Sequence, residues 1–119
     1  MYNVYSERIN MVNYGIVGCG MMGHEHLKNI KLLDGTNISA IFEPNSGMAQ
    51  SALKLAPEAS LFDNLENLLE FPDLDCLVIA SPNHCHLQQL FKISEIQKLP
   101  VLVEKPLFTA VEDLSLIHI

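Results

Sequence analysis

The chain of 119 residues has the length of one domain, with 49% hydrophobic residues and a formal net charge of −7. That hydrophobic content excludes an intrinsically disordered chain, and no apolar run reaches the roughly 18 to 20 residues of a membrane span. The acidic balance, without a basic cluster to offset it, disfavours nucleic acid as a partner. We expect a reducing, cytoplasmic setting, because residues 1–11 lack the apolar core of a signal peptide and three cysteines lack a framework spacing: Cys19, Cys76 and Cys85.

The two ends of the chain are set apart from the domain. Residues 1–10 show no periodic pattern and precede Met11, so we expect a disordered extension and either Met1 or Met11 as the true start. Residues 114–119 resemble the translated read-through of a sequencing adapter, with a genuine apolar helix segment as the alternative. We therefore expect the folded domain over residues 11–113.

Apolar periodicity predicts an alternation of strands and helices. The strands are expected at residues 12–17, 37–42, 60–62, 76–80 and 101–104. The helices are expected at residues 21–33, 47–55, 64–70 and 83–98. Because strands joined by helical crossovers pair in parallel, the pattern predicts a doubly wound α/β sheet, a Rossmann fold, with strand order 3-2-1-4-5.

The predicted helix boundaries follow from individual residues. The first helix is expected to bury Met22, Leu27, Ile30 and Leu33 and to end at Gly35 in the left-handed conformation. The turn at residues 44–46 offers a cap for the second helix. Asp63, with Glu66 three residues later, predicts a capping-box start for the third helix.

A glycine-rich turn follows the first predicted strand. Gly18, Gly20 and Gly23 match G-x-G-x-x-G between a strand and a helix, which is the context required of a dinucleotide fingerprint. Gly18 permits the tight turn, Gly20 lets a pyrophosphate approach the backbone, and Gly23 lets the helix pack on the strand. Free backbone N–H groups near Met21 and Met22 would receive the negative charge. A purely structural glycine turn is the alternative.

An acidic residue ends the second predicted strand. Glu43 lies about 20 residues beyond Gly23, where a carboxylate accepts the ribose hydroxyls of adenosine. A carboxylate there repels a 2′-phosphate, and the following Pro44, Asn45 and Ser46 include no arginine to bind one. The sequence therefore favours NAD over NADP as the cofactor, with a solvated strand-end glutamate as the alternative.

Two further motifs carry a narrower resemblance. Residues 80–86 read A-S-P-N-H-C-H after the fourth strand, and residues 103–106 read V-E-K-P at the end of the fifth. Together with the glycine turn and the I-F-E-P segment at residues 41–44, they resemble the amino-terminal domain of the Gfo/Idh/MocA family of glucose-fructose oxidoreductases and inositol dehydrogenases. The resemblance covers about residues 11 to 113.

The resemblance implies roles for particular residues. Ser81, Pro82 and Asn83 would line the nicotinamide side of the cofactor, with His86 nearby at the start of the next helix. Glu104 would help to position the nicotinamide ribose. Lys105 would be the catalytic lysine that meets the substrate hydroxyl or carbonyl. Chemistry agrees, because an ammonium at that edge of the sheet can hydrogen-bond a developing alkoxide, although an exposed strand-end cation is the alternative for Lys105.

The remaining histidines and cysteines suggest no separate site. His24 with His26, and His84 with His86, sit at i, i+2 spacing, which directs side chains to different faces of a helix, so no metal site is expected. Cys19 and Cys76 have no partner base in the sequence that would make either a nucleophile.

The resemblance also implies a function for a larger protein. Relatives continue into a second α/β domain with a catalytic histidine, and none of the five histidines here matches that region. The expected function is the nucleotide-binding part of an NAD-dependent oxidoreductase that acts on a sugar, cyclitol or related polyol. We expect the 119 residues alone to be inactive and the full-length protein to be a homo-oligomer. The alternative is a non-catalytic regulatory or sensor module of the same fold.

Overall fold

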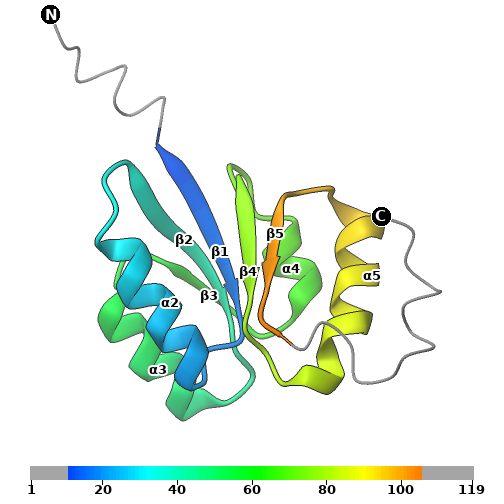
Figure 1. The fold of residues 1–119 in the computed structure, drawn as a ribbon, viewed down its shortest axis with the longest axis horizontal. Helices are drawn as coiled ribbons and strands as arrows, with labels where there is room; N and C mark the ends of the chain where they lie inside the picture. The colour runs from blue at the N-terminus through cyan, green and yellow to red at the C-terminus, as the bar shows by residue number, and fades with distance from the viewer. Residues whose placement is uncertain (1–10, 106–119) are drawn as a thin grey trace, which may run out of the picture.

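A computed structural model describes residues 11–105, which form a parallel sheet with helices on both faces (Figure 1). Its strands are β1 (Val12–Val17), β2 (Thr36–Phe42), β3 (Ser60–Phe62), β4 (Cys76–Ile79) and β5 (Val101–Val103). The spatial order β3-β2-β1-β4-β5 confirms the predicted order, and every neighbouring pair is parallel. The expected extension at residues 1–10 and the expected tail at residues 114–119 lie outside the described residues.

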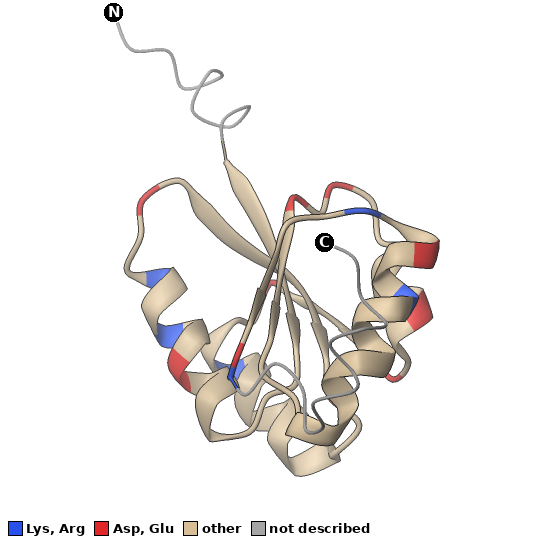
Figure 2. Cartoon of the chain, turned by 45° about the vertical axis from the view of Figure 1, so that its right-hand side comes forward, with Lys and Arg blue, Asp and Glu red and all other residues tan. Residues whose placement is uncertain are grey.

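The helices form two outer layers (Figure 1). One face of the sheet carries α2 (Met21–Lys31) and α3 (Ser46–Leu55), and the other carries α4 (Leu65–Leu69) and α5 (His86–Ile96), which follows the short 3-10 helix η1 (Asn83–Cys85). Within residues 11–105, no helix is long and apolar enough to cross a membrane. The lysines of the described residues are spread over several elements (Figure 2), although Lys28 and Lys31 share the last turn of α2.

The core has two halves, one on each face of the sheet. Ile16 and Val78 belong to the cluster beneath α2 and α3, whereas Val17 and Ile79 belong to the cluster beneath α4 and α5. This division follows from the strand geometry, because successive side chains point to opposite faces. Burial on both faces explains why β4 is apolar throughout and why β1 ends in the apolar Ile16 and Val17. The carboxyl ends of β1 and β4, which bear the glycine turn and Ser81, are thereby held side by side.

The helix α2 differs from the prediction at its end and on its buried face. It ends at Lys31, and its buried residues are Gly23, Leu27 and Ile30, whereas Met22 and Leu33 are 46% and 55% exposed. Glycine at position 23 allows the helix to lie close to the strand, so the buried stripe runs through a residue that apolar periodicity does not count. Gly35, with a φ of 75°, has the predicted left-handed conformation.

Two other helices begin differently from the prediction. The side chain of Asn64, rather than that of Asp63, caps α4 by accepting a hydrogen bond from the Asn67 amide at 2.8 Å. The predicted helix over residues 83–98 is divided, because the amide of Cys85 bonds the Pro82 carbonyl at 2.9 Å in a 3-10 turn before α5 starts. As predicted, a residue of the 44–46 turn caps α3: Asn45 accepts from the Met48 amide.

Candidate nucleotide-binding site

Two glycines of the turn are required by the packing of the chain itself. Gly18 has a φ of +95°, and a Cβ added to it would lie 2.5 Å from the Ser81 backbone. A Cβ on Gly23 would lie 2.2 Å from the Gly18 carbonyl oxygen. Because these contacts are with backbone atoms, they cannot be relieved by moving a flexible side chain. Gly18 and Gly23 therefore join β1, α2 and the Ser81 turn in one tight assembly.

Gly20 is different, because a Cβ added to it would meet nothing within 4 Å. It is the N-cap of α2, with a φ of −73° that any residue adopts, and no side chain caps this end of the helix. The first turn of α2 carries no acidic residue, and its first backbone N–H groups have no intrahelical acceptor. The open space at Gly20 thus lies at a helix end suited to an anion.

The carboxylate of Glu43 is hydrogen-bonded to the glycine turn. Its Oε1 accepts from the Cys19 amide at 2.7 Å, and its Oε2 accepts from the Asn45 amide at 2.8 Å. Glu43 was expected at a ribose, and its bonds to the glycine turn were not predicted. No local sequence pattern predicts this contact. The signal that was available is that Glu43 follows β2, which pairs with β1, the strand that leads into the glycine turn.

A groove of about 480 Å³ connects these elements at the carboxyl edge of the sheet. It is lined by the glycine turn, the end of β2 and the segment after β4: Gly18, Gly20, Met21, Met22, Phe42, Glu43, Pro44, Met48, Ala80, Ser81, Pro82, Cys85 and Gln89. A second hollow of about 500 Å³ over β2 and β3 shares Glu43 and Pro44 with it. Among the residues that the structure describes, neither lining includes a lysine or an arginine. The structure therefore brings most of the predicted residues from the first, second and fourth strand ends together at one groove, whereas Gly23, Asn83 and His86 are not part of its lining.

The segment after β4 is held by its own side chains. Ser81 donates its hydroxyl to Gln89, and its carbonyl oxygen lies 3.0 Å from Nε2 of His86. His86 is fully buried and is not among the residues that line the groove, whereas Ser81 and Pro82 are. Asn83, which follows Pro82, is exposed. His86 thus contacts the turn that faces the groove rather than the groove itself.

The two predicted residues after β5 lie outside the groove lining. The amide of Glu104 extends the β4–β5 ladder by donating to the Ile79 carbonyl at 2.9 Å. Its carboxylate Oε1 lies 2.5 Å from Nε2 of His26 in α2. Lys105 follows as an exposed residue. Both therefore stand at the carboxyl end of the strand next to β4, one position along the edge from the groove.

The histidines of α2 separate as their spacing predicts. His24 lies 3.0 Å from the Ser51 hydroxyl in α3, whereas His26 contacts Glu104 beyond β5. His84 is exposed and His86 is buried. Each of these rings therefore has different surroundings.

Cys19 is an inert thiol despite its place in the turn. Burial, and then the negative charge of Glu43, raise the pKa of Cys19 to about 12. Burial also raises the pKa of Cys76, with a smaller contribution from Asp75. A thiol with a raised pKa holds its proton at neutral pH, so neither residue acts as a nucleophile there.

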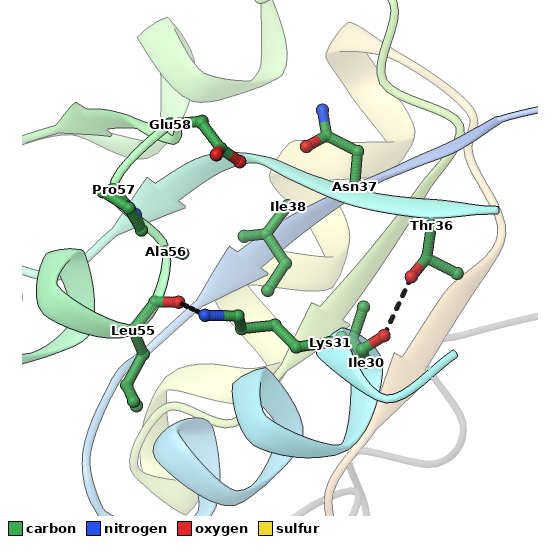
Figure 3. A pocket seen from close by; sticks show the side chains of 9 residues that line it. All are labelled: Ile30, Lys31, Thr36, Asn37, Ile38, Leu55, Ala56, Pro57 and Glu58. Carbon is green, nitrogen blue, oxygen red and sulfur yellow. Dashed lines mark hydrogen bonds between the residues drawn. The ribbon is translucent and has the colours of Figure 1, made fainter. Parts of the chain in front are cut away.

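Another depression lies at the opposite end of the sheet (Figure 3). It measures about 230 Å³ and lies between the carboxyl ends of α2 and α3. Two of its polar side chains form hydrogen bonds with carbonyls at helix ends. Lys31 donates to the Leu55 carbonyl, and the Thr36 hydroxyl donates to the Ile30 carbonyl at 2.8 Å. Because open α/β sheets bind ligands at the carboxyl ends of their strands, we attribute this depression to helix capping.

Comparison with known families agrees with this geometry. Residues 12–117 match the model of the GFO_IDH_MocA oxidoreductase family, described as an NAD-binding Rossmann fold. The chain belongs to this family. The resemblance expected from the motifs at residues 80–86 and 103–106 is thereby confirmed.

Curated relatives include several inositol dehydrogenases. The chain is 38% identical over 94 residues to inositol 2-dehydrogenase of Corynebacterium glutamicum strain R, an alignment that covers 78% of this chain and 28% of that protein. It is 30% identical over 105 residues to 2,7-anhydro-N-acetylneuraminate hydratase of Escherichia coli K12, with 87% of this chain and 27% of the relative covered. The chain thus spans less than a third of the length of these relatives.

Solved structures show the same fold. The myo-inositol dehydrogenase of Lactobacillus casei, in complex with NAD(H) and myo-inositol, matches with a TM-score of 0.82 at 25% identity over 88% of this chain and 31% of that one. The WlbA dehydrogenase of Bordetella pertussis, in complex with NADH and UDP-GlcNAcA, matches with a TM-score of 0.78 at 28% identity over 87% and 30%. The Rossmann fold predicted from the sequence is confirmed.

Proposed function

We propose that this chain is the nucleotide-binding part of an NAD-dependent oxidoreductase that acts on a cyclitol, a sugar or a related polyol. The observation that carries the proposal is the groove at the carboxyl edge, to which the glycine turn, Glu43 and the Ser81 turn all contribute. Membership of the NAD-binding family supports the cofactor. The relatives named as inositol 2-dehydrogenases support the substrate class.

In this proposal, different residues of the groove bind different parts of the cofactor. Gly20 and the amides at Met21, Met22 and Gly23 receive the pyrophosphate, because the space that a Cβ on Gly20 would fill is open and adjoins an uncapped helix N-terminus. Ser81, Pro82 and Asn83 lie along the nicotinamide side, with His86 holding the Ser81 carbonyl behind them. Gly18 acts through the tight turn itself.

Glu43 selects NAD over NADP in the same proposal. Its carboxylate faces the groove and a neighbouring hollow whose linings include no lysine or arginine to neutralise a 2′-phosphate. Two backbone amides already bond it, which fixes its orientation. A carboxylate oxygen has more than one lone pair, so each can still accept a ribose hydroxyl.

Lys105 and Glu104 are proposed to serve the reacting end. When bound, NAD supplies a nicotinamide ring that accepts a hydride from the substrate carbon or returns it. The Lys105 ammonium would donate a hydrogen bond to the substrate oxygen and stabilise the developing alkoxide, while the histidine that the resemblance implies in a second domain would take the hydroxyl proton, or return it in the reverse direction. The exposed position of Lys105 at the carboxyl end of β5 leaves the amine accessible to such a substrate. Glu104 would hold the nicotinamide ribose from the adjacent position.

The remaining features of the proposal concern the whole protein. Three free cysteines, two of them with a raised pKa, support a reducing cytoplasmic setting: Cys19, Cys76 and Cys85. We propose a homo-oligomer without nucleic-acid partners, in line with the net charge of −7.

Calorimetric titration of the purified protein with NAD, NADP and ADP tests the proposal. Binding of NAD and ADP with weaker binding of NADP is the expected result. Oxidation of myo-inositol or another cyclitol by the full-length protein with NAD then separates an enzyme from a regulatory module. NAD binding without turnover on cyclitols or sugars would favour the non-catalytic alternative, and failure to bind any of the three nucleotides would contradict the proposal.

A further inference from the structure

A single side-chain pair joins α2 to the end of β5. Nε2 of His26 lies 2.5 Å from Oε1 of Glu104, and the two side chains are 19% and 25% exposed. A carboxylate only accepts hydrogen bonds, so Nε2 of the imidazole donates. Sheltered from water, a charge-assisted bond of this kind is stronger than one on the open surface. The contact links positions that are far apart in the sequence.

Within residues 11–105, little else holds β5 on that face. It is a three-residue edge strand, and Leu102 on the α2 side is 58% exposed. Val101 and Val103 point the other way and pack against the cluster beneath α4 and α5. In the part of the chain that the structure describes, the bond to Glu104 is the one hydrogen bond between residues 101–105 and α2. The position of the strand end on this face therefore depends on His26.

The helix α2 is suited to act as the other half of this link. His26 lies three residues after Gly23 and four before Ile30, both buried, and so stands beside the helix face that packs on the sheet. On the opposite flank, His24 contacts Ser51 of α3. The same helix begins at the glycine turn. A fixed α2 thus holds the end of β5 in a set position relative to the place where the pyrophosphate is proposed to bind.

We propose that His26 is a positioning residue, which holds Glu104 and thereby fixes Lys105 relative to the glycine turn. The inference rests on the proposed function, in which Lys105 meets the substrate oxygen. Because proton and hydride transfer both require near-attack geometry, freedom at the end of β5 slows turnover even when the cofactor is bound. In this proposal α2 has two roles: its N-terminus binds the pyrophosphate, and its His26 holds Glu104.

Hydrogen exchange in the full-length protein tests the link without reference to activity. In His26→Leu and in Glu104→Ala, the amide of residue 104, which donates to the Ile79 carbonyl, is expected to exchange about tenfold faster, since local opening there costs less free energy. His26→Gln should restore slow exchange, because the glutamine amide can donate from close to the position of Nε2. The matched control is Glu25→Gln, which changes the adjacent exposed residue of α2 and only its 3.7 Å pair with Lys28.

Kinetics then tests the positioning role. With NAD and myo-inositol as probes, His26→Leu should lower kcat about tenfold, and His26→Gln should recover most of it. The Kd for NAD should rise by a smaller factor, about two- to threefold, because Glu104 is also proposed to hold the nicotinamide ribose. Unchanged exchange in His26→Leu would overturn the link, and faster exchange with parental kcat would overturn its role in positioning. Loss of NAD affinity equal to the loss of kcat would also overturn it, since a general defect of α2 gives that result.

Failure of the proposed function can be distinguished from failure of the link between His26 and Glu104. A parent protein that binds no NAD, or a Lys105→Ala variant with parental kcat, contradicts the proposed function and removes the catalytic part of this inference with it. The exchange comparison is independent of both results. It decides by itself whether His26 anchors β5.

Discussion

The ends of β1 and β5 are built in different ways, although both are proposed to hold parts of one ligand. At the end of β1, Gly18 and Gly23 are in contact with backbone atoms, and the Glu43 carboxylate is bonded to the Cys19 amide at 2.7 Å. At the end of β5, Glu104 and Lys105 follow a three-residue edge strand whose α2 side is largely uncovered. The nucleotide end is thus determined by close packing, and the reacting end by a few polar bonds.

This difference predicts which substitutions harm folding and which harm function. Changes at Gly18 and Gly23 of the β1 turn should reduce stability first, because backbone atoms lie against both residues. Changes at the end of β5 should leave the fold intact and alter catalysis, because Lys105 is exposed and Glu104 contacts one side chain. Gly20 is the exception within the turn. It belongs to the same glycine motif, but a Cβ added to it would contact no neighbouring atom.

The largest expected effect is on catalysis at the end of β5. Lys105→Ala in the full-length protein should lower kcat by about 10² to 10⁴ and leave NAD affinity nearly unchanged, because the amine acts on the substrate oxygen and not on the cofactor phosphates. Steady-state kinetics with a cyclitol and calorimetry with NAD measure the two quantities. Lys98→Ala, at another exposed lysine, is the control. Parental kcat in Lys105→Ala would show that the lysine is structural.

The next largest effect is on stability at the end of β1. Gly23→Ala should lower the free energy of unfolding by about 1 to 3 kcal/mol, because its Cβ would overlap the Gly18 carbonyl. Gly18→Ala should be worse, since the same kind of overlap is added to a φ of +95°, at an added cost of about 1 to 3 kcal/mol. Urea unfolding measures both changes. Parental stability in either variant would mean that the turn is looser than its contacts indicate.

Glu43→Ala should affect both properties, because the side chain supports the turn and faces the groove. We expect NAD binding to weaken by about 1.5 to 3 kcal/mol, the value of a charge-assisted hydrogen bond, and the preference over NADP to decline. Calorimetric titration with both cofactors measures it. Glu58→Ala, which lies at the depression in Figure 3, is the control for loss of a negative charge. Equal or better NADP binding by the parent protein would reject the assignment.

The smallest effect concerns Cys19 at alkaline pH. Its folded pKa of about 12 exceeds the ordinary value of 9.0. The unfolded thiol therefore loses its proton first, so the thiol's contribution to stability is complete below pH 9 and declines as the pH rises toward 12. Between pH 8 and pH 10.5 the parent should lose about 1 to 2 kcal/mol more stability than Cys19→Ala. Parallel urea curves that show no such difference would mean that Cys19 ionises in the folded state.

Sequence patterns predicted the fold well because its signals are local. Strand order followed from the alternation of strands with helices. Gly18 and Gly35 were expected at turns and Gly23 at a close contact between helix and strand, and the structure places all three there. The α4 cap was displaced by one residue because Asp63 and Asn64 are both good caps, and only the backbone conformation decides between them.

The site was predicted as a set of residues, but its internal contacts were not. The bond between Glu43 and Cys19 and the pair of His26 with Glu104 join residues from different strand and helix ends, and no periodicity encodes such contacts. The burial of His86 was also missed, because a histidine beside a binding motif looks like a ligand until its packing is known. These contacts depend on the twist and spacing of the assembled sheet.

Gly20→Ala is the measurement that tests the account most directly. Its new Cβ would meet no atom of the described chain within 4 Å, so the free energy of unfolding should change by no more than about 0.5 kcal/mol. NAD affinity should nevertheless decrease at least about tenfold, because the methyl group would fill the space proposed for the pyrophosphate. Unfolding and NAD titration of Gly20→Ala beside Gly23→Ala decide the matter. A destabilised Gly20→Ala, or one that binds NAD like the parent, would contradict the account.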